Sequence, residues 1–216
     1  MTTRPMGLRE RKKKETRQQI SNIATRMFIE RGFDEVTIAE IAQAAEVAKM
    51  TVTNYFPRKE DLVLDLHDEI VAHPARTVAE RASGESALAA LRRDYFAALE
   101  RRDALLGFSG RPFARTVTGS PALLARLREL HEQRETALAA VLAGEPGTDG
   151  ADGTTGDVIA RMVAGQLVSA LRVLFGEAIR RTLDGEDEDT VAAALHTSAT
   201  QVFDLLEPSL GAYAVR

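Results

Sequence analysis

The sequence predicts an all-α protein, and three observations support this fold class. Apolar residues recur three and four positions apart along most of the chain, which is the spacing of a buried helix face. No run of alternating β-branched residues is bounded by turn residues, as a strand would be. Glycines, prolines and acidic clusters interrupt the apolar pattern at helix-length intervals. We expect about nine helices, in a smaller N-terminal domain over residues 1–60 and a larger C-terminal domain over residues 61–216.

One helix and then two short ones are predicted in the N-terminal part. The first helix ends where Gly32 provides a glycine just beyond its last turn. Thr37 and Glu40 form a capping box, which predicts the start of the second helix. A tight turn leads to a compact third helix over residues 48–54, and Pro57 marks the next break. The apolar positions of the first two helices are Ile20, Ile23, Ala24, Met27, Phe28, Ile38, Ile41 and Ala42.

Longer helices are expected in the rest of the chain. A fourth helix is predicted over residues 58–72, and Pro74 ends or kinks it. Ser120 followed by Pro121 is a strong helix start, because serine caps the helix and proline fits its first position. Residues 103–119 are less regular. Further helices are expected over residues 86–101, 121–143 and 157–182, then a flexible acidic loop at 144–156, an acidic break at 184–189 and a last helix carrying Val191 to Leu206.

Positive charge is concentrated at the N-terminal end. Residues 1–60 hold 12 lysines and arginines against 8 acidic residues, whereas the rest of the chain holds 16 against 24. A basic head on an acidic body suggests that only the head contacts a polyanion, although exposed N-termini are often basic without such a role. The most basic stretch precedes the first apolar helix pattern and is either a DNA-contacting arm, which we favour, or a solvated tail. Its basic residues are Arg4, Arg9, Arg11, Lys12, Lys13, Lys14 and Arg17.

Several function classes find no support in the sequence. No apolar run approaches the roughly 18 residues of a membrane span, and no apolar segment follows the basic N-terminus as in a secretory signal. The absence of cysteine excludes a disulfide scaffold, a thiolate zinc site and a cysteine nucleophile, and it fits a cytoplasmic location. No phosphate loop, serine elbow or paired acid and base is evident, so we expect no enzyme and no cofactor. No metal site is expected either, because the histidines lack ligand spacing: His67, His73, His131 and His196.

The most informative stretch is residues 36–62, VTIAEIAQAAEVAKMTVTNYFPRKEDL. Two short helices joined by a tight turn form a helix-turn-helix, whose second helix is a candidate for insertion into a DNA major groove. The chain here resembles the TetR family of bacterial regulators. The resemblance lies in MFIERGFDEVTIAEIA at the end of the first helix, AEVAKMTVTNYF as the recognition segment and PRKEDL at the start of the fourth. It covers about residues 9–63, and the remainder is similar in helical layout and length only.

The resemblance implies a set of DNA contacts. Thr37 caps the second helix and places its hydroxyl and amides at a phosphate. On the recognition helix Lys49 can donate to guanine, Asn54 can pair with adenine and Met50 can contact a thymine methyl group. The family often has other residues where Met50 and Thr53 stand, so the operator sequence is left open. The other implied contacts are Thr51, Thr53, Tyr55 and Lys59, and the implied packing positions are Val47, Val52, Phe56 and Leu62.

By the same resemblance, the C-terminal half is expected to bind a small-molecule effector and to form a homodimer through its last two helices. The predicted helix over residues 157–182 is apolar on more than one face, which suits a dimer interface but also burial within one chain. Arg111 and Arg172 stand among apolar residues. A buried arginine would need a partner such as an acidic ligand, and a surface arginine is the alternative. The candidate ligand-binding residues, which core packing also explains, are Tyr95, Phe96, Phe108, Phe113, Met162, Gln166, Arg172 and Phe175.

Taken together, these features predict a homodimeric, sequence-specific DNA-binding regulator that a small molecule releases from a palindromic operator. Its two recognition helices would enter successive major grooves about 34–36 Å apart, and the ligand would favour a dimer with another spacing. A transcriptional activator, or a DNA-binding protein without a ligand, is the alternative within this class. The competing class is a helical enzyme or binding protein in which the helix-turn-helix is only structural. A Lys49→Ala/Asn54→Ala variant that kept its function would favour this class.

Overall fold

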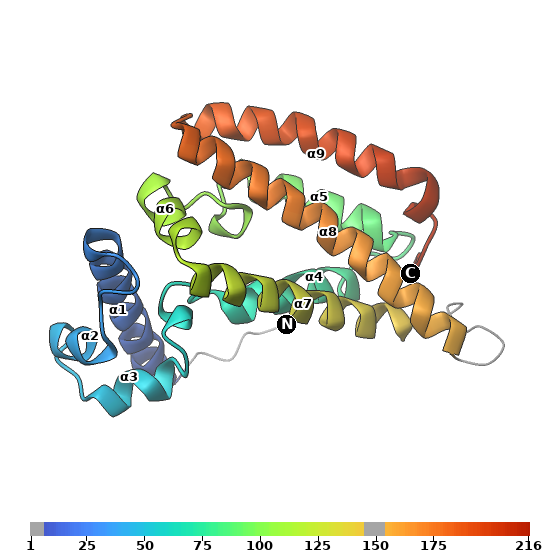
Figure 1. The fold of residues 1–216 in the computed structure, drawn as a ribbon. Coiled ribbons are helices and arrows are strands. Elements are labelled where there is room, and N and C mark those ends of the chain that lie inside the picture. The colour runs from blue at the N-terminus through green and yellow to red at the C-terminus, as the bar shows by residue number, and fades with distance from the viewer. Residues whose placement is uncertain (1–6, 145–153) are drawn as a thin grey trace. The chain divides into compact units, whose positions relative to one another are not determined.

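The computed structural model describes residues 7–144 and 154–216, and these residues form helices and turns without a strand. Nine α-helices and two short 3-10 helices follow one another in the described ranges (Figure 1). The predicted all-α fold is therefore confirmed. Arg4 and most of the predicted acidic loop over residues 144–156 lie outside the described residues.

The chain divides into two compact units. The N-terminal unit consists of the residues up to Asp65 together with Arg115–Leu124. The C-terminal unit consists of Leu66–Ala114 and Ala125–Arg216. Each unit is built around buried apolar side chains of its own helices.

Four helices of the N-terminal unit carry the helix-turn-helix: α1 (Leu8–Arg31), α2 (Ile38–Ala44), α3 (Lys49–Tyr55) and the 3-10 helix η1 (Glu60–Leu62). Gly32 ends α1 with a φ of 96°, as its position in the sequence predicts. The capping box is confirmed, because the Glu40 amide donates to Thr37 Oγ1 at 3.2 Å while the Thr37 amide donates to Glu40 Oε2 at 2.8 Å. In the turn between α2 and α3, Glu46 adopts a φ of 55°.

Aromatic rings form much of the core of the N-terminal unit. The ring centroids of Phe28 and Phe33 lie 5.0 Å apart. Lys59 Nζ lies 4.4 Å from the centroid of the Phe33 ring and donates to the Phe33 carbonyl at 2.5 Å. The predicted packing position Val47 is half-buried. The fully buried apolar side chains of this core include Ile20, Ala24, Phe28, Val36, Ile41, Val52, Phe56 and Leu62.

The predicted helix over residues 58–72 is wrong at both ends. η1 and a turn occupy its first part, and α4 (His67–Ala79) continues through Pro74. Proline has no amide hydrogen, so it cannot donate to the carbonyl four residues earlier, that of Ile70. Arg134 Nε donates to this carbonyl at 2.7 Å instead. A side chain of another helix thus replaces the donor that α4 lacks.

The C-terminal unit packs its long helices around one apolar core. Besides α4 it contains α5 (Ala87–Glu100), the 3-10 helix η2 (Ala104–Leu106), the start of α6 (Arg111–Gly119), most of α7 (Pro121–Ala143), α8 (Thr154–Asp184) and α9 (Glu188–Leu210). α9 packs against both α8 and α5, and α8 and α9 lie side by side in Figure 1. The predicted irregular stretch over residues 103–119 holds η2 and α6. Core side chains include Leu88, Tyr95, Leu138, Leu167, Leu174, Leu195 and Phe203.

α8 is long and apolar enough, by length and composition, to cross a membrane. Charged residues interrupt its apolar runs, but its most apolar 18-residue window has a mean hydropathy of 1.6, so the expectation of no candidate segment needs correction. One such helix is weak evidence for a membrane span, since the core helix of a soluble protein has the same composition. Only 33% of its most apolar window is buried, so part of its apolar surface lies exposed on this chain.

Arg81 joins the C-terminal residues to the turn between α4 and α5. Its side chain is 2% exposed. Nη2 donates to the Ala214 carbonyl at 2.9 Å and Nη1 to the Val78 carbonyl at 2.6 Å. We expect Arg81→Met to lower the free energy of unfolding by about 2–4 kcal/mol, because it removes charged donors from buried carbonyls.

A matched exposed arginine provides the control for this prediction. Arg93 pairs with Glu85 at 2.9 Å, but 61% of its side chain is exposed. Arg93→Met is therefore expected to cost less than about 1 kcal/mol. Urea unfolding followed by circular dichroism compares the two variants, and equal losses would contradict the role assigned to Arg81.

Candidate nucleic-acid interface

α3 places its apolar and polar residues on different sides. Val52 is fully buried against the core, whereas Lys49, Met50 and Asn54 are exposed, Met50 to 68%. An ammonium group, a thioether methyl group and a carboxamide therefore project from one two-turn helix. These groups can donate to guanine, contact a thymine methyl group and pair with adenine in a major groove.

The other predicted contacts on α3 lie closer to the protein. Thr51, Thr53 and Tyr55 are half-buried. Thr53 Oγ1 donates to the Met50 carbonyl at 3.1 Å, so its hydroxyl hydrogen is engaged while its lone pairs are not. These residues can reach the DNA backbone at the edges of the exposed face.

The start of α2, where Thr37 is predicted to meet a phosphate, already holds a carboxylate. Glu40 Oε2 accepts from Thr37 Oγ1 at 2.7 Å and from the Thr37 amide, and Glu40 Oε1 accepts from Arg31 at 2.7 Å. These bonds, that of Arg31 first, lower the pKa of Glu40 to about 2. A phosphate at this helix start must therefore displace Glu40 or use the amides of Ile38 and Ala39.

Lys59 and Arg17 make contacts within the N-terminal unit that stabilise its fold. Lys59 is half-buried between aromatic rings, and its phosphate contact remains a prediction. Arg17 Nη2 donates to the Asp65 carbonyl at 2.9 Å, and its guanidinium lies 4.6 Å from the centroid of the Phe56 ring. Arg17 thus differs from the basic residues at positions 9–14, which are exposed.

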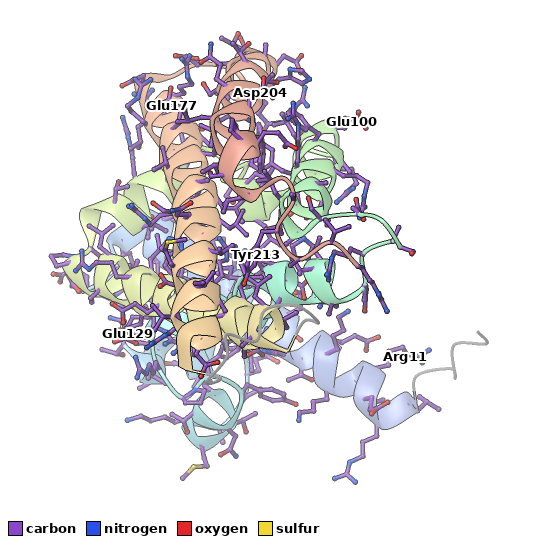
Figure 2. The ribbon with its side chains drawn as sticks, turned by 90° about the vertical axis from the view of Figure 1, so that its right-hand side faces the viewer. Arg11, Glu100, Glu129, Glu177, Asp204 and Tyr213 are labelled. Atoms are coloured by element: carbon purple, nitrogen blue, oxygen red, sulfur yellow. The ribbon has the colours of Figure 1, made fainter. Side chains whose placement is uncertain are left out.

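The basic segment does not precede the first helix, contrary to expectation. α1 begins at Leu8, so this segment forms its first turns. Arg11 lies near this start (Figure 2), where it pairs with Glu15 at 3.6 Å and is 61% exposed. A helix offers its charges at fixed spacing, which suits phosphate contacts along a DNA backbone. The exposed basic residues of these turns are Arg9, Arg11, Lys12, Lys13 and Lys14.

The predicted ligand-binding residues do not gather around one cavity. A cavity in the C-terminal unit is lined by residues of α4, α5, η2, α7 and α8, and Tyr95 is the one candidate in its wall. Phe96 and Phe108 pack against the apolar core. The arginines singled out in the sequence, Arg111 and Arg172, are both exposed. The other candidates are half-buried or exposed: Phe113, Phe175, Met162 and Gln166.

Arg81, Arg126 and Arg134 are the buried arginines of this unit, and the one that lines the cavity is Arg134, which sequence reasoning missed. It is 7% exposed and lines the cavity. The signal was present, since Arg134 lies four residues after Leu130 and four before Leu138 on the apolar stripe of α7. A charged residue on such a stripe indicates burial of the charge.

Comparison with known proteins places the chain among transcriptional regulators. The family profile for "Bacterial regulatory proteins, tetR family" matches residues 20–66. The chain is 31% identical over 209 residues to the HTH-type transcriptional regulator TcmR of Streptomyces glaucescens, a match covering 94% of this chain and 88% of the relative. It is 43% identical over 60 residues to the HTH-type transcriptional regulator LuxR of Vibrio harveyi, over 28% and 27% of the two chains.

Solved structures share the fold at low sequence identity. GusR of Salmonella enterica superposes with a TM-score of 0.51 at 20% identity, over 91% of this chain and 95% of that chain. NalD of Pseudomonas aeruginosa, described as the secondary repressor of the MexAB-OprM multidrug efflux pump, gives a TM-score of 0.52 at 19% identity, over 88% and 97%.

Proposed function

Because this chain belongs to the TetR family of bacterial transcriptional regulators, we propose that it is a homodimeric repressor in the cytoplasm, which leaves a palindromic operator when a small-molecule effector binds. Residues 1–60 contact the DNA, and residues 61–216 bind the effector and form the dimer. The exposed face of α3, with Lys49 and Asn54, is the observation that carries the DNA-binding role.

Sequence is read by α3, and affinity comes from the surrounding charges. Lys49, Met50 and Asn54 contact base edges. Contacts to the phosphate backbone add affinity without adding sequence information. We assign these backbone contacts to Thr37, Thr51, Thr53, Tyr55 and Lys59, and to Arg11, Lys12, Lys13 and Lys14 on the first turns of α1.

The exposed apolar surface of α8 supports a homodimer. Val158, Met162 and Val173 lie at helical spacing and are 56%, 51% and 53% exposed. Leu205 of the neighbouring α9 is 80% exposed. α8 lies at the front of Figure 2, with Glu177 labelled on it and Asp204 on α9. A second copy that packs α8 and α9 against the same helices removes these side chains from water in a four-helix arrangement.

Selection of genomic fragments tests the proposed function. The purified full chain is mixed with fragments of the source genome at about 150 mM salt, which suppresses non-specific phosphate binding. We expect enrichment of a palindrome whose half-sites lie about one helical turn apart or a multiple of it. Equal recovery of all fragments would overturn sequence-specific regulation.

The dimer interface is tested by a charge on the exposed apolar face. Val173→Glu is expected to give a monomer, because a buried carboxylate without a partner is unfavourable. The variant should bind a palindromic fragment about 100-fold more weakly, since each half-site is then bound separately. Sedimentation velocity and fluorescence anisotropy measure the two effects.

The matched control for this change is Val215→Glu. Val215 is 50% exposed, almost as much as Val173, but it lies beyond the end of α9. This variant should remain dimeric and bind the palindrome as the unchanged protein does. A Val173→Glu protein that stays dimeric would contradict the proposed interface.

A further inference from the structure

A small cavity in the C-terminal unit combines an apolar wall with a few polar groups. Its volume is about 40 Å³. A water molecule needs about 10–15 Å³ of cavity volume, so the cavity holds a group the size of a carboxylate and not a larger organic molecule. Apolar side chains of α5, η2 and α8 form much of the wall, among them Leu91, Leu105 and Leu171. The polar residues of the wall are His73, Asp94, Tyr95, Asp103 and Arg134.

Arg134 is held in the wall by one end of its guanidinium. Nε donates to the Ile70 carbonyl at 2.7 Å, which Pro74 leaves without its helical donor. Among the described residues, this is the one hydrogen bond of Arg134, and no carboxylate lies within ion-pair distance of it. Burial lowers the pKa of Arg134 to about 10, so the group remains charged near pH 7. Its Nη1 and Nη2 donors therefore lack an anionic partner.

Tyr95 brings a second unused donor to the same cavity. The residue is 2% exposed, and its hydroxyl has no hydrogen-bond partner among the described residues. Burial raises the pKa of Tyr95, so the hydroxyl keeps its proton. A buried hydroxyl without a partner is unfavourable, and it requires an acceptor that this chain does not provide here.

The carboxylates in the wall are already engaged. Asp94 accepts from His73 Nε2 at 2.6 Å, and this bond raises the pKa of His73. Asp103 accepts from the Leu105 amide at 3.0 Å and lies 3.6 Å from Arg101. Next to Arg134 on α7, His131 has its pKa lowered to about 4 by burial and is neutral at pH 7. None of these groups supplies the missing anion.

We propose that the effector is an organic acid, whose carboxylate binds the free end of the Arg134 guanidinium and accepts from the Tyr95 hydroxyl. This inference rests on the proposed function, in which the C-terminal unit binds an effector. A carboxylate matches the two parallel N–H donors of an arginine, and the bond is stronger away from water. The apolar body of the acid lies against the apolar part of the wall, formed by Leu91, Leu105 and Leu171.

The size of the cavity adds a condition to this proposal. The space of about 40 Å³ holds the carboxylate, so the body of a larger acid enters only if part of the wall moves. α4 and α5 are joined across this wall by the His73–Asp94 bond. The carboxylate of the bound acid, when it lies near His73, competes with Asp94 for the hydrogen-bond donor of His73. Binding of the acid therefore favours conformations in which α4 is less tightly joined to α5.

Thermal unfolding of the full chain with matched acids and amides tests the proposal. The probes are formate, acetate, benzoate and octanoate, each beside its neutral amide, at pH 7.5 and constant ionic strength. We expect at least one acid to raise Tm by about 5 °C at roughly 100 times its Kd, and its amide to have little effect. The proposal is overturned if no acid raises Tm, or if acids and amides act alike.

Three variants show whether the effect passes through the assigned residues. Arg134→Met should abolish the acid-induced rise, measured against the Tm of the same variant without acid. Tyr95→Phe removes one hydroxyl, should fold as the unchanged protein does, and should weaken acid binding about tenfold. Arg128→Met on the exposed side of α7 is the matched control and should retain the full rise. An undiminished rise in both Arg134→Met and Tyr95→Phe would overturn the proposal.

Release of DNA separates this inference from the proposed function. If an active acid releases the selected fragment from the unchanged protein but not from Arg134→Met, both the acid site and the release of DNA by an effector are supported. If it raises Tm through Arg134 but leaves the DNA complex intact, the acid site stands and release by an effector fails. If a different molecule releases DNA equally from both proteins, the proposed function stands and the acid site is overturned as the effector site.

Discussion

The double variant Lys49→Ala/Asn54→Ala is expected to lose specific DNA binding, with an affinity for the selected palindrome lowered about 100-fold or more. A side chain that bonds well to a base edge contributes about 1–3 kcal/mol to discrimination, and a dimer uses each contact twice. Both side chains are exposed. The variant should therefore unfold at the same temperature as the unchanged protein.

A second double variant separates base recognition from general charge. Arg26 and Asn22 are exposed on α1, so Arg26→Ala/Asn22→Ala also removes one positive charge and one amide. Fluorescence anisotropy distinguishes a loss of base recognition from a loss of general charge. It is measured with the palindrome and with a scrambled duplex at several salt concentrations. The α3 variant should bind both duplexes alike, whereas the α1 variant should keep its preference. A preference retained by the α3 variant would mean that another element reads the sequence.

The parts of the fold that depend on neighbours in sequence could be predicted. Gly32 ends α1, and Thr37 and Glu40 form the capping box, because both motifs act within one turn of backbone. The start of α1 could not be read in this way. The residues from Leu8 up to Ile20 include no regular apolar face, so periodicity gives no signal there, although lysine, arginine, glutamate and glutamine favour helix.

The wrong C-terminal end predicted for α4 and the missed cavity residue Arg134 have one non-local cause. Pro74 predicts a helix end or a kink when only local backbone bonds are considered. Arg134, far along the chain, supplies the donor that the Ile70 carbonyl lacks, so the helix continues. The same contact holds the charge of Arg134 inside the C-terminal unit. The apolar stripe on α7 shows that Arg134 lies among apolar residues. Its partner, the Ile70 carbonyl, is on α4 and can be identified only from the packing of the two helices.

The exposed residues of α3 could be predicted individually, while their surroundings could not. The periodicity of α3 places Val52 inward and Asn54 outward, as found. The capping box predicts the bond between the Thr37 amide and Glu40, but not the bond that Arg31, nine residues earlier, donates to the same carboxylate. Lys59 likewise has a core contact with Phe33 that a sequence pattern does not reveal.

Phe28→Ala is expected to unfold the N-terminal unit while the C-terminal unit stays folded. Phe28 is 1% exposed, and its ring packs on that of Phe33. Truncation of a buried phenylalanine costs about 3–5 kcal/mol, through lost burial and the cavity left behind. A unit with so few buried residues has little stability in reserve. DNA binding should therefore disappear, together with the hydrogen-exchange protection of α1, α2 and α3.

Ile29, the next residue, provides the matched control because it is 41% exposed. Ile29→Ala should cost less than about 1 kcal/mol and leave hydrogen exchange in α2 and α3 unchanged. Hydrogen exchange followed by mass spectrometry also reports on α5, α8 and α9 in the same samples. If Phe28→Ala lowers protection equally throughout the chain, the two units unfold together. Protection lost from α1 to α3 alone, with the acid-induced rise in Tm retained, means that DNA binding and effector binding depend on separate cores.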